Sequence, residues 1–353
     1  MLSELPAGKH DIIAQYALRC DISPRGIIMR LGTAAWISAV FAIVVFCEAG
    51  VAAETYPNKP IRLIVPFPPG GGNDIVGRVC AQRLADQLGQ QVIVDNRGGG
   101  AGILGAETAA RASADGYTLL FGGVASLSIN PGLRKNLAYD PLKDFAAVSL
   151  VATGANVLAT HPSLAVRNVK ELIALAKAKP GQLYFASAGV GSSNHLAGEL
   201  FNTMAGTQLV HVPYKGSGPA MTELLAGQVG ISFAAISAVL PFVKESRLRG
   251  LAVTTAKRTA IMPELPTVSE SGLAGFEVVN WYAVVAPAAT SPAIIQRLNA
   301  ELLKVVATPE VKKRFLEIGV DAAGSTPADL TAYNRSELAK WAKVIKSAGV
   351  KPE

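Results

Sequence analysis

Short apolar runs alternate with amphipathic stretches along most of the chain. The runs IRLIV (61–65) and QVIVDN (91–96) flank a segment whose apolar positions recur about every 3.6 residues and end at Gly89. Another apolar run, YTLLFGG (117–123), follows the next amphipathic segment. Repeated alternation of strand and helix is typical of an α/β fold, in which we expect largely parallel sheets.

Two longer apolar segments divide the chain. VSLVATGANVLATHP (148–162) leads out of the first group of strands and helices, and FEVVNWYAVVAPA (276–288) leads back into it. We therefore predict a first domain of residues 54–154 plus 279–353 and a second domain of residues 155–278, with the two crossing strands as the hinge of a cleft. Three further helices are expected to complete the first domain, at 292–306, 309–317 and 327–347.

The N-terminal part has the pattern of a targeting segment. A basic residue, an apolar run over 31–46 and small residues that end at Ala53 form the three parts of a secretory signal peptide. We expect residues 1–53, a signal peptide with an upstream extension, to be removed whether translation starts at Met1 or Met29, and the mature protein to lie in the periplasm. A membrane anchor is the alternative, because the apolar run is only slightly shorter than a spanning helix.

Composition and charge narrow the classes of partner. Half of the 353 residues are apolar and only 17% are charged, which fits a globular protein rather than a disordered one. The formal net charge is +7, and the basic residues are scattered rather than gathered with aromatic residues, so nucleic acid is not an expected partner. A mildly positive field suits anionic small molecules.

Cysteine and histidine usage argues against a metal site or a cofactor. Cys20 and Cys47 lie in the predicted leader, so Cys80 is left without a partner for an internal disulfide and is expected to be a small buried residue. The histidines of the predicted mature chain are widely spaced. We therefore expect no metal ion and no cofactor.

Glycine-rich loops follow several predicted strands: PFPPGGGND (66–74), NRGGGAG (96–102), FGGVAS (121–126), SAGVGSSNH (187–195) and YKGSGP (214–219). Glycine lets backbone N–H groups turn toward a ligand, and a helix N-terminus adds partial positive charge. Ligands of α/β folds bind at such loops, at the carboxyl ends of the strands. The loops therefore predict a site for a carboxylate or a phosphate.

Single motifs are also compatible with two kinds of enzyme. Residues 100–105 match the GxGxxG pattern of a dinucleotide site, but the strand 117–123 ends in glycine where an acidic residue should bind the ribose. Ser192 and His195 could form the nucleophile and base of a hydrolase, but the GxSxG elbow is absent. Ser192 and Ser193 are better interpreted as helix N-cap residues, and His195 as a packing or hydrogen-bonding residue.

Several side chains near these loops have two interpretations each. Phe67 could stack on a ligand or fill the interior, and Asp74 is expected to cap its own helix rather than contact an anion. Trp281 and Tyr282 could line the cleft or pack in the hinge. Lys215 could attract an anion or point into water.

Six longer motifs occur in order along the predicted mature chain: YPNKPIRLIVPFPPGGGNDIVGR, VDNRGGGAGILGAETAARASADGYTLLFG, FASAGVGSSNHLAGELF, HVPYKGSGPAMTELLAGQV, LRGLAVTTAKR and PELPTVSESG. Together they resemble the Bug-type extracytoplasmic solute receptors, the substrate-binding subunits of tripartite tricarboxylate transporters. The resemblance implies a two-lobed periplasmic binding protein fold, type II-like, whose lobes close on a small carboxylate. Such ligands include di- and tricarboxylic acids, acidic amino acids and aromatic acids.

The resemblance also implies binding roles for two loops, Phe67 through Asp74 and Ser187 through His195. Backbone amides of the first loop, with Ser192, Ser193 and Ser126, would hold a carboxylate. The residues expected to contact the ligand are Phe67, Gly70, Gly71, Gly72, Asn73, Asp74, Ser126, Ser187, Gly189, Gly191, Ser192, Ser193, His195 and Tyr214.

The chain departs from the family pattern at three positions. Gly230 and Ala235 stand where such proteins usually carry aspartates, and Asn73 stands where threonine or serine is commoner. A missing acid near the cleft removes a partner for a ligand amino group, which favours a plain carboxylate over an amino acid.

These observations together predict a monomeric receptor, not an enzyme. It would deliver a small organic acid to the membrane subunits of a tripartite tricarboxylate-type transporter. A receptor of the same fold that reports ligand occupancy to a signalling protein is an alternative that the sequence does not separate from transport.

Overall fold

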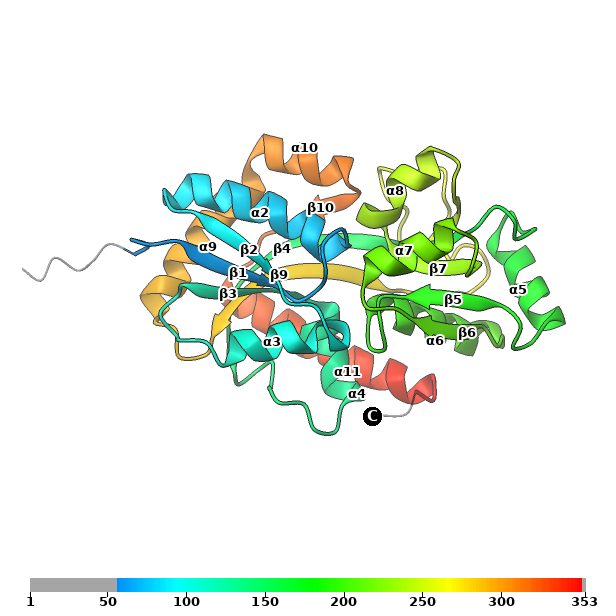
Figure 1. Cartoon of the computed structure of the whole chain (residues 1–353), viewed down its shortest axis with the longest axis horizontal. Helices are drawn as coiled ribbons and strands as arrows, with labels where there is room; N and C mark the ends of the chain where they lie inside the picture. Colours follow the sequence, from blue (N-terminus) through cyan, green and yellow to red (C-terminus); the bar gives the residue numbers. More distant parts are fainter. Residues whose placement is uncertain (1–55, 351–353) are drawn as a thin grey trace, which may run out of the picture. The chain divides into compact units, whose positions relative to one another are not determined.

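The computed structural model describes residues 56–350, and the predicted signal peptide lies outside this range. Within it the strands form one sheet in the order β2-β1-β3-β9-β4-β7-β5-β6, with β8 and β10 both paired to β4 (Figure 1). The strands are β1 (Ile61–Val65), β2 (Val92–Asn96), β3 (Thr118–Gly123), β4 (Phe145–Thr160), β5 (Tyr184–Ser187), β6 (Val210–Pro213), β7 (Ile231–Ala235), β8 (Arg249–Val253), β9 (Val279–Pro287) and β10 (Val320–Ala322).

Helices cover both faces of this sheet. In Figure 1, α2 and α10 lie on one side of the first strands and α3 and α11 on the other. The helices are α2 (Gly72–Leu88), η1 (Gly100–Gly102), α3 (Ile103–Ala110), η2 (Ala125–Ile129), α4 (Asn130–Leu133), α5 (Val169–Ala178), α6 (Ser193–Ala205), α7 (Ser217–Leu225), α8 (Ile236–Lys244), α9 (Pro292–Ala307), α10 (Pro309–Glu317) and α11 (Pro327–Ser347).

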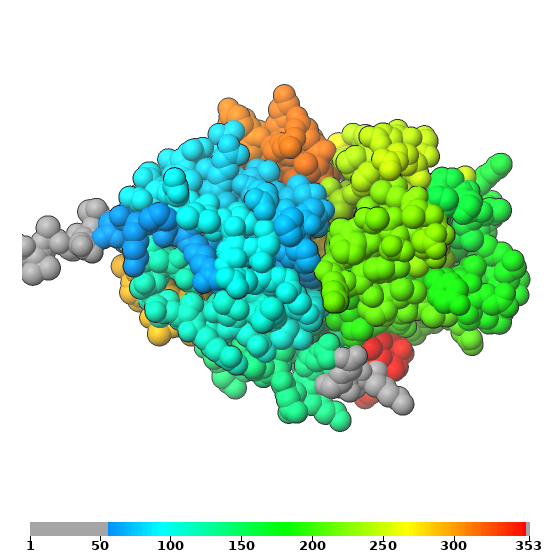
Figure 2. All heavy atoms as spheres, viewed as in Figure 1, coloured from blue at the N-terminus to red at the C-terminus, as the bar shows by residue number. Residues whose placement is uncertain are grey.

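The long strand β4 joins two groups of strands. It pairs with β9 and β10 through Ala155, and from Asn156 onward it pairs with β7 and β8. We call β1, β2, β3, β10 and the helices packed on them the first lobe, and β5, β6, β7, β8 and their helices the second lobe. Figure 2 shows the surface of the first lobe, in blue and cyan, meeting the green surface of the second lobe along a seam.

The expectation of largely parallel sheets is wrong for the centre of the molecule. β1 pairs in parallel with β2 and β3, and β5 pairs in parallel with β6 and β7. Every pairing of β4 and β9, by contrast, is antiparallel. The reason is topological, because β4 carries the chain out of the first lobe and β9 carries it back in the opposite direction. The fold is therefore a mixed α/β fold of two lobes with crossing strands.

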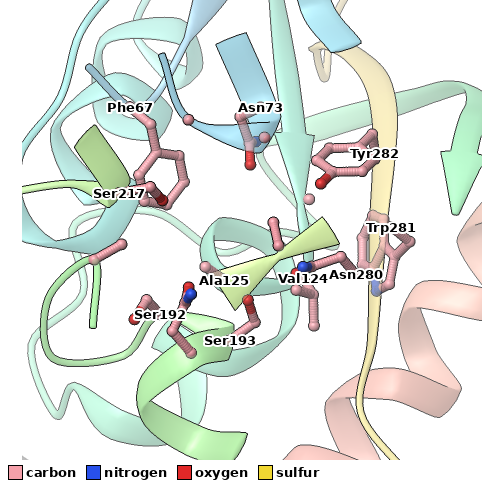
Figure 3. A pocket seen from close by; sticks show the side chains of 16 residues that line it. Phe67, Asn73, Val124, Ala125, Ser192, Ser193, Ser217, Asn280, Trp281 and Tyr282 are labelled. Atoms are coloured by element: carbon pink, nitrogen blue, oxygen red, sulfur yellow. The ribbon is translucent and has the colours of Figure 1, made fainter. Parts of the chain in front are cut away.

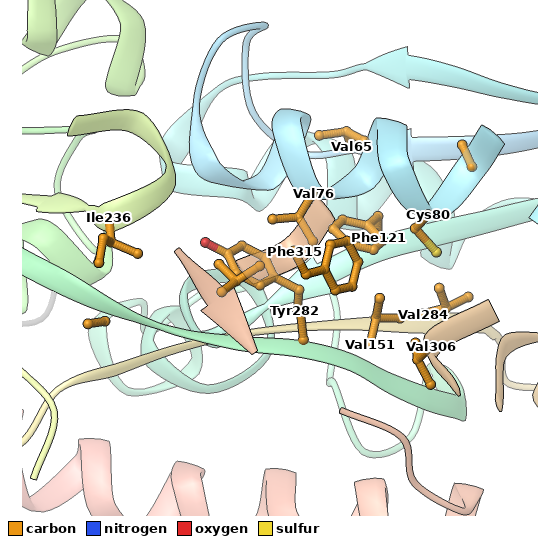
Figure 4. Packing of buried hydrophobic residues seen from close by; sticks show 14 of the residues in the cluster. Val65, Val76, Cys80, Phe121, Val151, Ile236, Tyr282, Val284, Val306 and Phe315 are labelled. Atoms are coloured by element: carbon orange, nitrogen blue, oxygen red, sulfur yellow. The ribbon is translucent and has the colours of Figure 1, made fainter. Parts of the chain in front are cut away.

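The sheet of the first lobe separates two hydrophobic clusters. Leu63 and Val65 of β1 pack with Val76 and Cys80 of α2 (Figure 4), whereas Ile64 belongs to the cluster on the opposite face. Successive side chains of a strand point to opposite faces, so the apolar residues of β1 serve both clusters. Cys80 is a buried free thiol whose pKa is raised to about 12 by burial, which agrees with the role expected from the sequence.

The sequence did not indicate α8, β10 or the turn η2. The helix α8 contains Pro241, a residue that argues against a helix interior in the sequence. The strand β10 has only three residues and is defined by its antiparallel partner β4 rather than by its own composition. The turn η2 is a π-helix, a rare geometry that has no sequence signature of this kind.

A polar cluster lies where the crossing strands pass between the lobes. The Asn280 side chain donates to Asn156 Oδ1. The Thr254 hydroxyl accepts from the Asn156 backbone N–H at 2.9 Å and donates to the Val278 carbonyl at 2.6 Å. These buried hydrogen bonds tie β4, β9 and the end of β8 together at one point.

Close packing of α6 on β5 predicts the effect of one methyl group. A Cβ added at Gly198 would overlap the ring of Phe185, which is fully buried. We expect Gly198→Ala to lower the free energy of unfolding by about 1–3 kcal/mol, as overpacked cores do. Gly218→Ala, in the helix α7, is the matched control, because the nearest atom to a Cβ there is the Pro69 carbonyl oxygen at 3.5 Å. Urea denaturation measures both, and equal midpoints for the two variants would contradict the packing argument.

Candidate functional site

A pocket lies where loops of both lobes meet the strand β9 (Figure 3). The loops after β1, β3, β5, β6 and β7 each reach it, and β9 forms one wall. The lining residues are Phe67, Gly71, Gly72, Asn73, Gly123, Val124, Ala125, Ala188, Ser192, Ser193, Asn194, Ser217, Ala235, Asn280, Trp281 and Tyr282.

Helix N-termini surround this pocket. The helices α2, α6 and α7 and the turn η2 begin at lining residues, and α8 begins at the residue after Ala235. The N-terminus of a helix carries a partial positive charge and unpaired backbone N–H groups. None of the sixteen lining residues is charged. The electrostatic character of the site therefore comes from the backbone, and it favours an anion.

Several of these helix starts have no side-chain cap. Gly71 precedes α2 and Gly216 precedes α7, and neither can offer a side-chain acceptor. Three helices that start away from the pocket are capped by side chains, α5 by Asn168, α9 by Ser291 and α11 by Thr326. The uncapped starts leave first-turn N–H groups available to a ligand.

Glycine is required where the first loop meets β9. A Cβ at Gly72 would lie 2.7 Å from the hydroxyl oxygen of Tyr282 and 3.1 Å from the Cβ of Ala235. A Cβ at Gly123 would overlap the carbonyl oxygen of Trp281. Only residues without side chains let the first lobe approach β9 this closely.

Asn73 presents an unsatisfied donor to the site. Its Nδ2 atom is buried and has no hydrogen-bond partner among the described residues. Figure 3 shows the side chain of Asn73 directed from the start of α2 into the pocket. A buried donor without an acceptor is costly, about 1–3 kcal/mol, so the arrangement is suited to a ligand that supplies an acceptor.

The aromatic wall on β9 is fixed from behind by a buried carboxylate. Glu337 of α11 accepts hydrogen bonds from the indole N–H groups of Trp281 at 3.2 Å and Trp341 at 3.0 Å. Tyr333 packs edge-on against Trp281, with ring centroids 5.6 Å apart. Burial raises the pKa of Tyr282 to about 12, so this lining residue is neutral at ordinary pH.

The structure divides the residues predicted from the sequence into three groups. Six line the pocket: Phe67, Gly71, Gly72, Asn73, Ser192 and Ser193. Two line a larger cavity beside it: Gly189 and Tyr214. Six line neither: Gly70, Asp74, Ser126, Ser187, Gly191 and His195.

Asp74 stabilises the first loop. The expectation that it caps its own helix is wrong. Its carboxylate accepts from the Gly70 backbone N–H at 2.9 Å and from the Asn96 side chain at 2.9 Å. It also forms an ion pair with Arg78. These hydrogen bonds and the nearby guanidinium hold the pKa of Asp74 below its ordinary value against the opposing effect of burial. Asp74 thus shapes the glycine turn from outside the pocket.

Two predicted serines are engaged with their own loops. Ser126 is 1% exposed, and its hydroxyl bonds to Gly123 at 3.3 Å. Ser192 caps α6, accepting from the His195 backbone N–H at 3.3 Å and donating to the Gly189 carbonyl at 2.7 Å. The N-cap role expected from the sequence is confirmed for Ser192, whose hydroxyl is committed to the backbone, and is wrong for Ser193, which is the first residue of α6.

His195 and His211 lie beneath the second-lobe loop 187–195. The rings of His195 and His211 stack with centroids 4.0 Å apart. Nδ1 of His195 accepts from the Gly191 N–H at 3.3 Å, and Nε2 of His211 is hydrogen-bonded to Ser187. Burial lowers the pKa of His195 to about 4 and that of His211 to about 3. Both rings are therefore neutral supports for the loop.

Some lining residues were not among those expected to contact the ligand. Ser217 lies in a loop that the glycine pattern indicated, and Asn194 lies in the second-lobe loop 187–195. Trp281 and Tyr282, which the sequence assigned either to the cleft or to the hinge, line the pocket. Asn280 carried no signal, because polar residues next to a strand or helix end are common. Ala235, noted as a departure from the family pattern, lines the pocket.

The free volume of the pocket is small, about 30 Å³. Pockets for small organic ligands usually enclose roughly 300–1,000 Å³. The pocket is therefore much smaller than a usual ligand site.

Residues 56–350 offer neither a membrane-spanning helix nor a cluster of metal ligands. This part of the chain contains no helix that is long and apolar enough to cross a membrane. It also contains no group of three or more histidine, cysteine, aspartate or glutamate side chains placed to hold a metal ion.

Comparison with known proteins identifies relatives of the whole described chain. Residues 76–350 match the model of the tripartite tricarboxylate transporter family receptors. Protein BugT of Bordetella pertussis is 38% identical over 316 residues, which cover 89% of this chain and 97% of BugT.

Solved structures agree with that match. The structure of R. palustris Rpa4515 with adipate is 36% identical, has a TM-score of 0.83 and is matched over 84% of this chain and 100% of its own. MatC from Rhodopseudomonas palustris with bound malate is 29% identical, has a TM-score of 0.78 and is matched over 82% of this chain and 100% of its own.

The buried carboxylate behind β9 predicts a stability effect. Replacing Glu337 by Ala leaves two buried indole donors without an acceptor, so the free energy of unfolding should fall by about 2–4 kcal/mol. Glu317→Ala, which removes an exposed ion pair with Arg314, should change it by less than about 1 kcal/mol. Urea denaturation followed by tryptophan fluorescence measures both values, and a harmless Glu337→Ala would show that the two indoles find other acceptors.

The stacked histidines predict sensitivity to acid. An unfolded chain binds protons at histidine near pH 6.5, whereas the folded protein resists protonation down to about pH 4 at His195 and about pH 3 at His211. The unfolded state therefore holds more protons below about pH 6.5. Each pKa unit of difference between the two states corresponds to about 1.4 kcal/mol, so the free energy of unfolding should fall by a few kcal/mol between pH 6.5 and 4. Glu199, whose Oε1 lies 3.7 Å from His195 Nε2, faces the same cluster.

Urea denaturation across this pH range tests the assignment. His211→Gln should make the free energy of unfolding depend less steeply on pH. The amide can still bond to Ser187 in the folded protein, but it cannot take up a proton in the unfolded chain. His161→Gln, a change outside the cluster, should leave the slope unaltered. If His211→Gln keeps the full slope, the acid sensitivity arises elsewhere.

Proposed function

The chain belongs to the tripartite tricarboxylate transporter receptor family, and from that premise we propose that it binds a small organic carboxylate between its lobes and delivers it to a transporter of this type. Members of the family are periplasmic receptors. The observation that carries the proposal is the convergence of uncapped helix N-termini on a pocket lined by no charged side chain. A carboxylate satisfies such a site, because its two oxygens accept several N–H groups at once.

Individual contacts in this site are modest. A hydrogen bond from a neutral donor to a charged acceptor contributes about 1.5–3 kcal/mol. The uncapped first turns of α2 and α7, the Asn73 amide and the Ser193 hydroxyl together can supply several such bonds. Rpa4515, a relative with bound adipate, and MatC, with bound malate, support a carboxylic acid as the ligand class.

The absence of an acidic side chain from the pocket lining supports a ligand without an amino group. Ala235 occupies the position where an aspartate was expected from the family pattern. An ammonium group would find only the positive ends of helices and uncharged side chains, so its desolvation would not be compensated. We therefore propose a plain organic acid rather than an amino acid.

Ligand capture would proceed by separation and closure of the two lobes. We place the boundaries at 154/155 and 278/279, which gives a first domain of 54–154 plus 279–353 and a second of 155–278. The support is that β4 changes partners from β9 to β7 between Ala155 and Asn156. Such a pair of crossing strands is a suitable hinge.

We propose further that the protein is an exported monomer without enzymatic activity. The hydrolase alternative finds no support in the pocket, because the Ser192 hydroxyl donates to a backbone carbonyl and His195 does not line the site. Export would follow from the signal peptide predicted over residues 1–53, with cleavage near Ala53.

Asn73 provides a test of both the site and the sign of the ligand's charge. Isothermal titration of the purified protein against a panel of organic acids should yield at least one ligand, with a matching rise in melting temperature. For that ligand, Asn73→Ala should weaken binding about tenfold, because one donor is lost. Asn73→Asp should weaken it further, by about a hundredfold, because the new carboxylate repels an anion.

Gln208→Glu is the matched control, since it makes the same amide-to-acid change at an exposed position outside the pocket. It should leave affinity unchanged. Tighter binding by Asn73→Asp, or a panel that contains no ligand, would overturn the proposal of a carboxylate receptor.

A further inference from the structure

A second, larger cavity lies directly beside the pocket. Its volume is about 640 Å³, compared with about 30 Å³ for the inner pocket. Phe67 and Ala188 line both of them, and Ala125 lines the inner pocket. The passage from the inner pocket to the outer cavity therefore runs between these side chains. We call Phe67, Ala125 and Ala188 the apolar neck.

The residues of the apolar neck come from three loops and from both lobes. Phe67 follows β1 and Ala125 follows β3 in the first lobe, whereas Ala188 follows β5 in the second. Their exposed fractions are 9%, 6% and 5%, yet they form a cluster separate from the two hydrophobic cores. Apolar side chains that belong to neither core and line a cavity present their free surface to whatever passes through it.

The serines next to the neck alanines in the chain do not make the neck polar. Ser126 is hydrogen-bonded to the backbone of Gly123 at 3.3 Å, and Ser187 accepts from the Gly189 N–H at 3.0 Å. Neither serine lines the inner pocket or the outer cavity. Their hydroxyl groups are therefore engaged with their own loops.

The polar side chains of the site lie on the inner side of the neck. Asn73, Ser193 and Ser217 line the inner pocket and not the outer cavity. Ser217 lies close to Phe67 in Figure 3, but it too belongs to the inner pocket. A hydroxyl group of a ligand can thus find a partner before the neck, whereas inside the neck it meets a phenyl ring and two methyl groups.

Backbone contacts fix the width of the neck. A Cβ at Gly102 would lie 3.3 Å from the ring of Phe67, so the ring packs directly on the backbone of the loop 96–102. A Cβ at Gly189, the residue after Ala188, would lie 3.9 Å from the Cβ of Ala101 in the same loop. The loop of the second lobe therefore closes on the loop that supports Phe67, and no long side chain has to be displaced to define the opening.

We propose that the apolar neck selects the ligand, which is an acid whose hydrocarbon segment carries no polar substituent where it passes Phe67, Ala125 and Ala188. The proposal rests on the proposed function, because it assumes that the carboxylate lies in the inner pocket. A methylene group in the neck exchanges water for apolar contacts. A hydroxyl group there loses its water and gains no hydrogen bond, so it lowers the affinity about tenfold to a hundredfold.

Titration calorimetry on the intact protein tests the neck by moving a hydroxyl group along one ligand. Hexanoate is the parent, because its alkyl chain provides carbon atoms before, within and beyond the neck. The monohydroxyhexanoates that carry the hydroxyl on each chain carbon in turn are the probes. We expect a loss of about tenfold to a hundredfold at the carbon that lies in the neck, or at two adjacent ones. At the other carbons the affinity should stay within about threefold of hexanoate, because polar groups or water are in reach.

A serine in the neck should reduce this discrimination. Ala188→Ser in the second lobe and Ala125→Ser in the first each offer a hydroxyl partner, so the preference for hexanoate over the disfavoured isomer should fall about fivefold. Ala174→Ser, at an exposed position of α5 that lines neither cavity, is the matched control and should leave the preference unchanged. The circular dichroism spectrum of each variant verifies that it is folded.

The possible results separate the neck from the proposed function. Equal binding of all isomers, an equal loss at every carbon, or neck serines that leave the preference unchanged would refute the neck and leave the carboxylate receptor standing. The same holds if hexanoate does not bind although another acid of the panel does. If no acid binds and Asn73→Asp has no effect on any ligand, the proposed function itself fails.

Discussion

The antiparallel pairing of β4 with β9 is the interaction on which the rest of the structure depends. Both strands run from one lobe into the other, so they belong to both hydrophobic cores and hold the carboxyl ends of the parallel strands on either side facing the same space. Loops that are distant in sequence meet there for this reason. β9 also supplies the wall of the pocket, with Asn280 bound to Asn156 of β4 and Trp281 bound to Glu337 of α11. The strand that connects the lobes is thus the strand that would contact a ligand.

The glycines of the site have a steric and an electrostatic role that cannot be separated. At Gly72, a side chain would clash with Tyr282, and the same absence of a side chain leaves the start of α2 uncapped. The bare backbone brings the first lobe close to β9 and at the same time exposes N–H groups in a place from which water is largely excluded. Such dipoles are stronger there than at the surface, because the local dielectric constant is low.

Much of the fold could be predicted from the sequence, because strong periodicity marks most of its elements. The helices predicted at 309–317 and 327–347 are found at those positions, and the strand predicted at 61–65 is found unchanged. The direction of strand pairing could not be predicted from the local pattern. Every pairing of β4 and β9 is antiparallel, and these pairings are determined by the path of the whole chain between the lobes. In the same way, glycine content located the loops of the site, but it did not indicate the directions of their side chains. Asp74 is an example, because its carboxylate binds the Gly70 N–H and the Asn96 side chain rather than lining the pocket.

The pocket has no lining side chain that changes its charge near neutral pH, since its only titratable member is Tyr282. An anion held there would be bound by backbone N–H groups and uncharged polar side chains, none of which titrates near neutral pH. The protonation state of the acid itself then decides whether binding occurs, and carboxylic acids lose their charge only below about pH 4. The lining of such a site adds no pH dependence of its own to the affinity for the ionised acid near neutral pH, so the acidity of the surroundings would act on binding through the ligand.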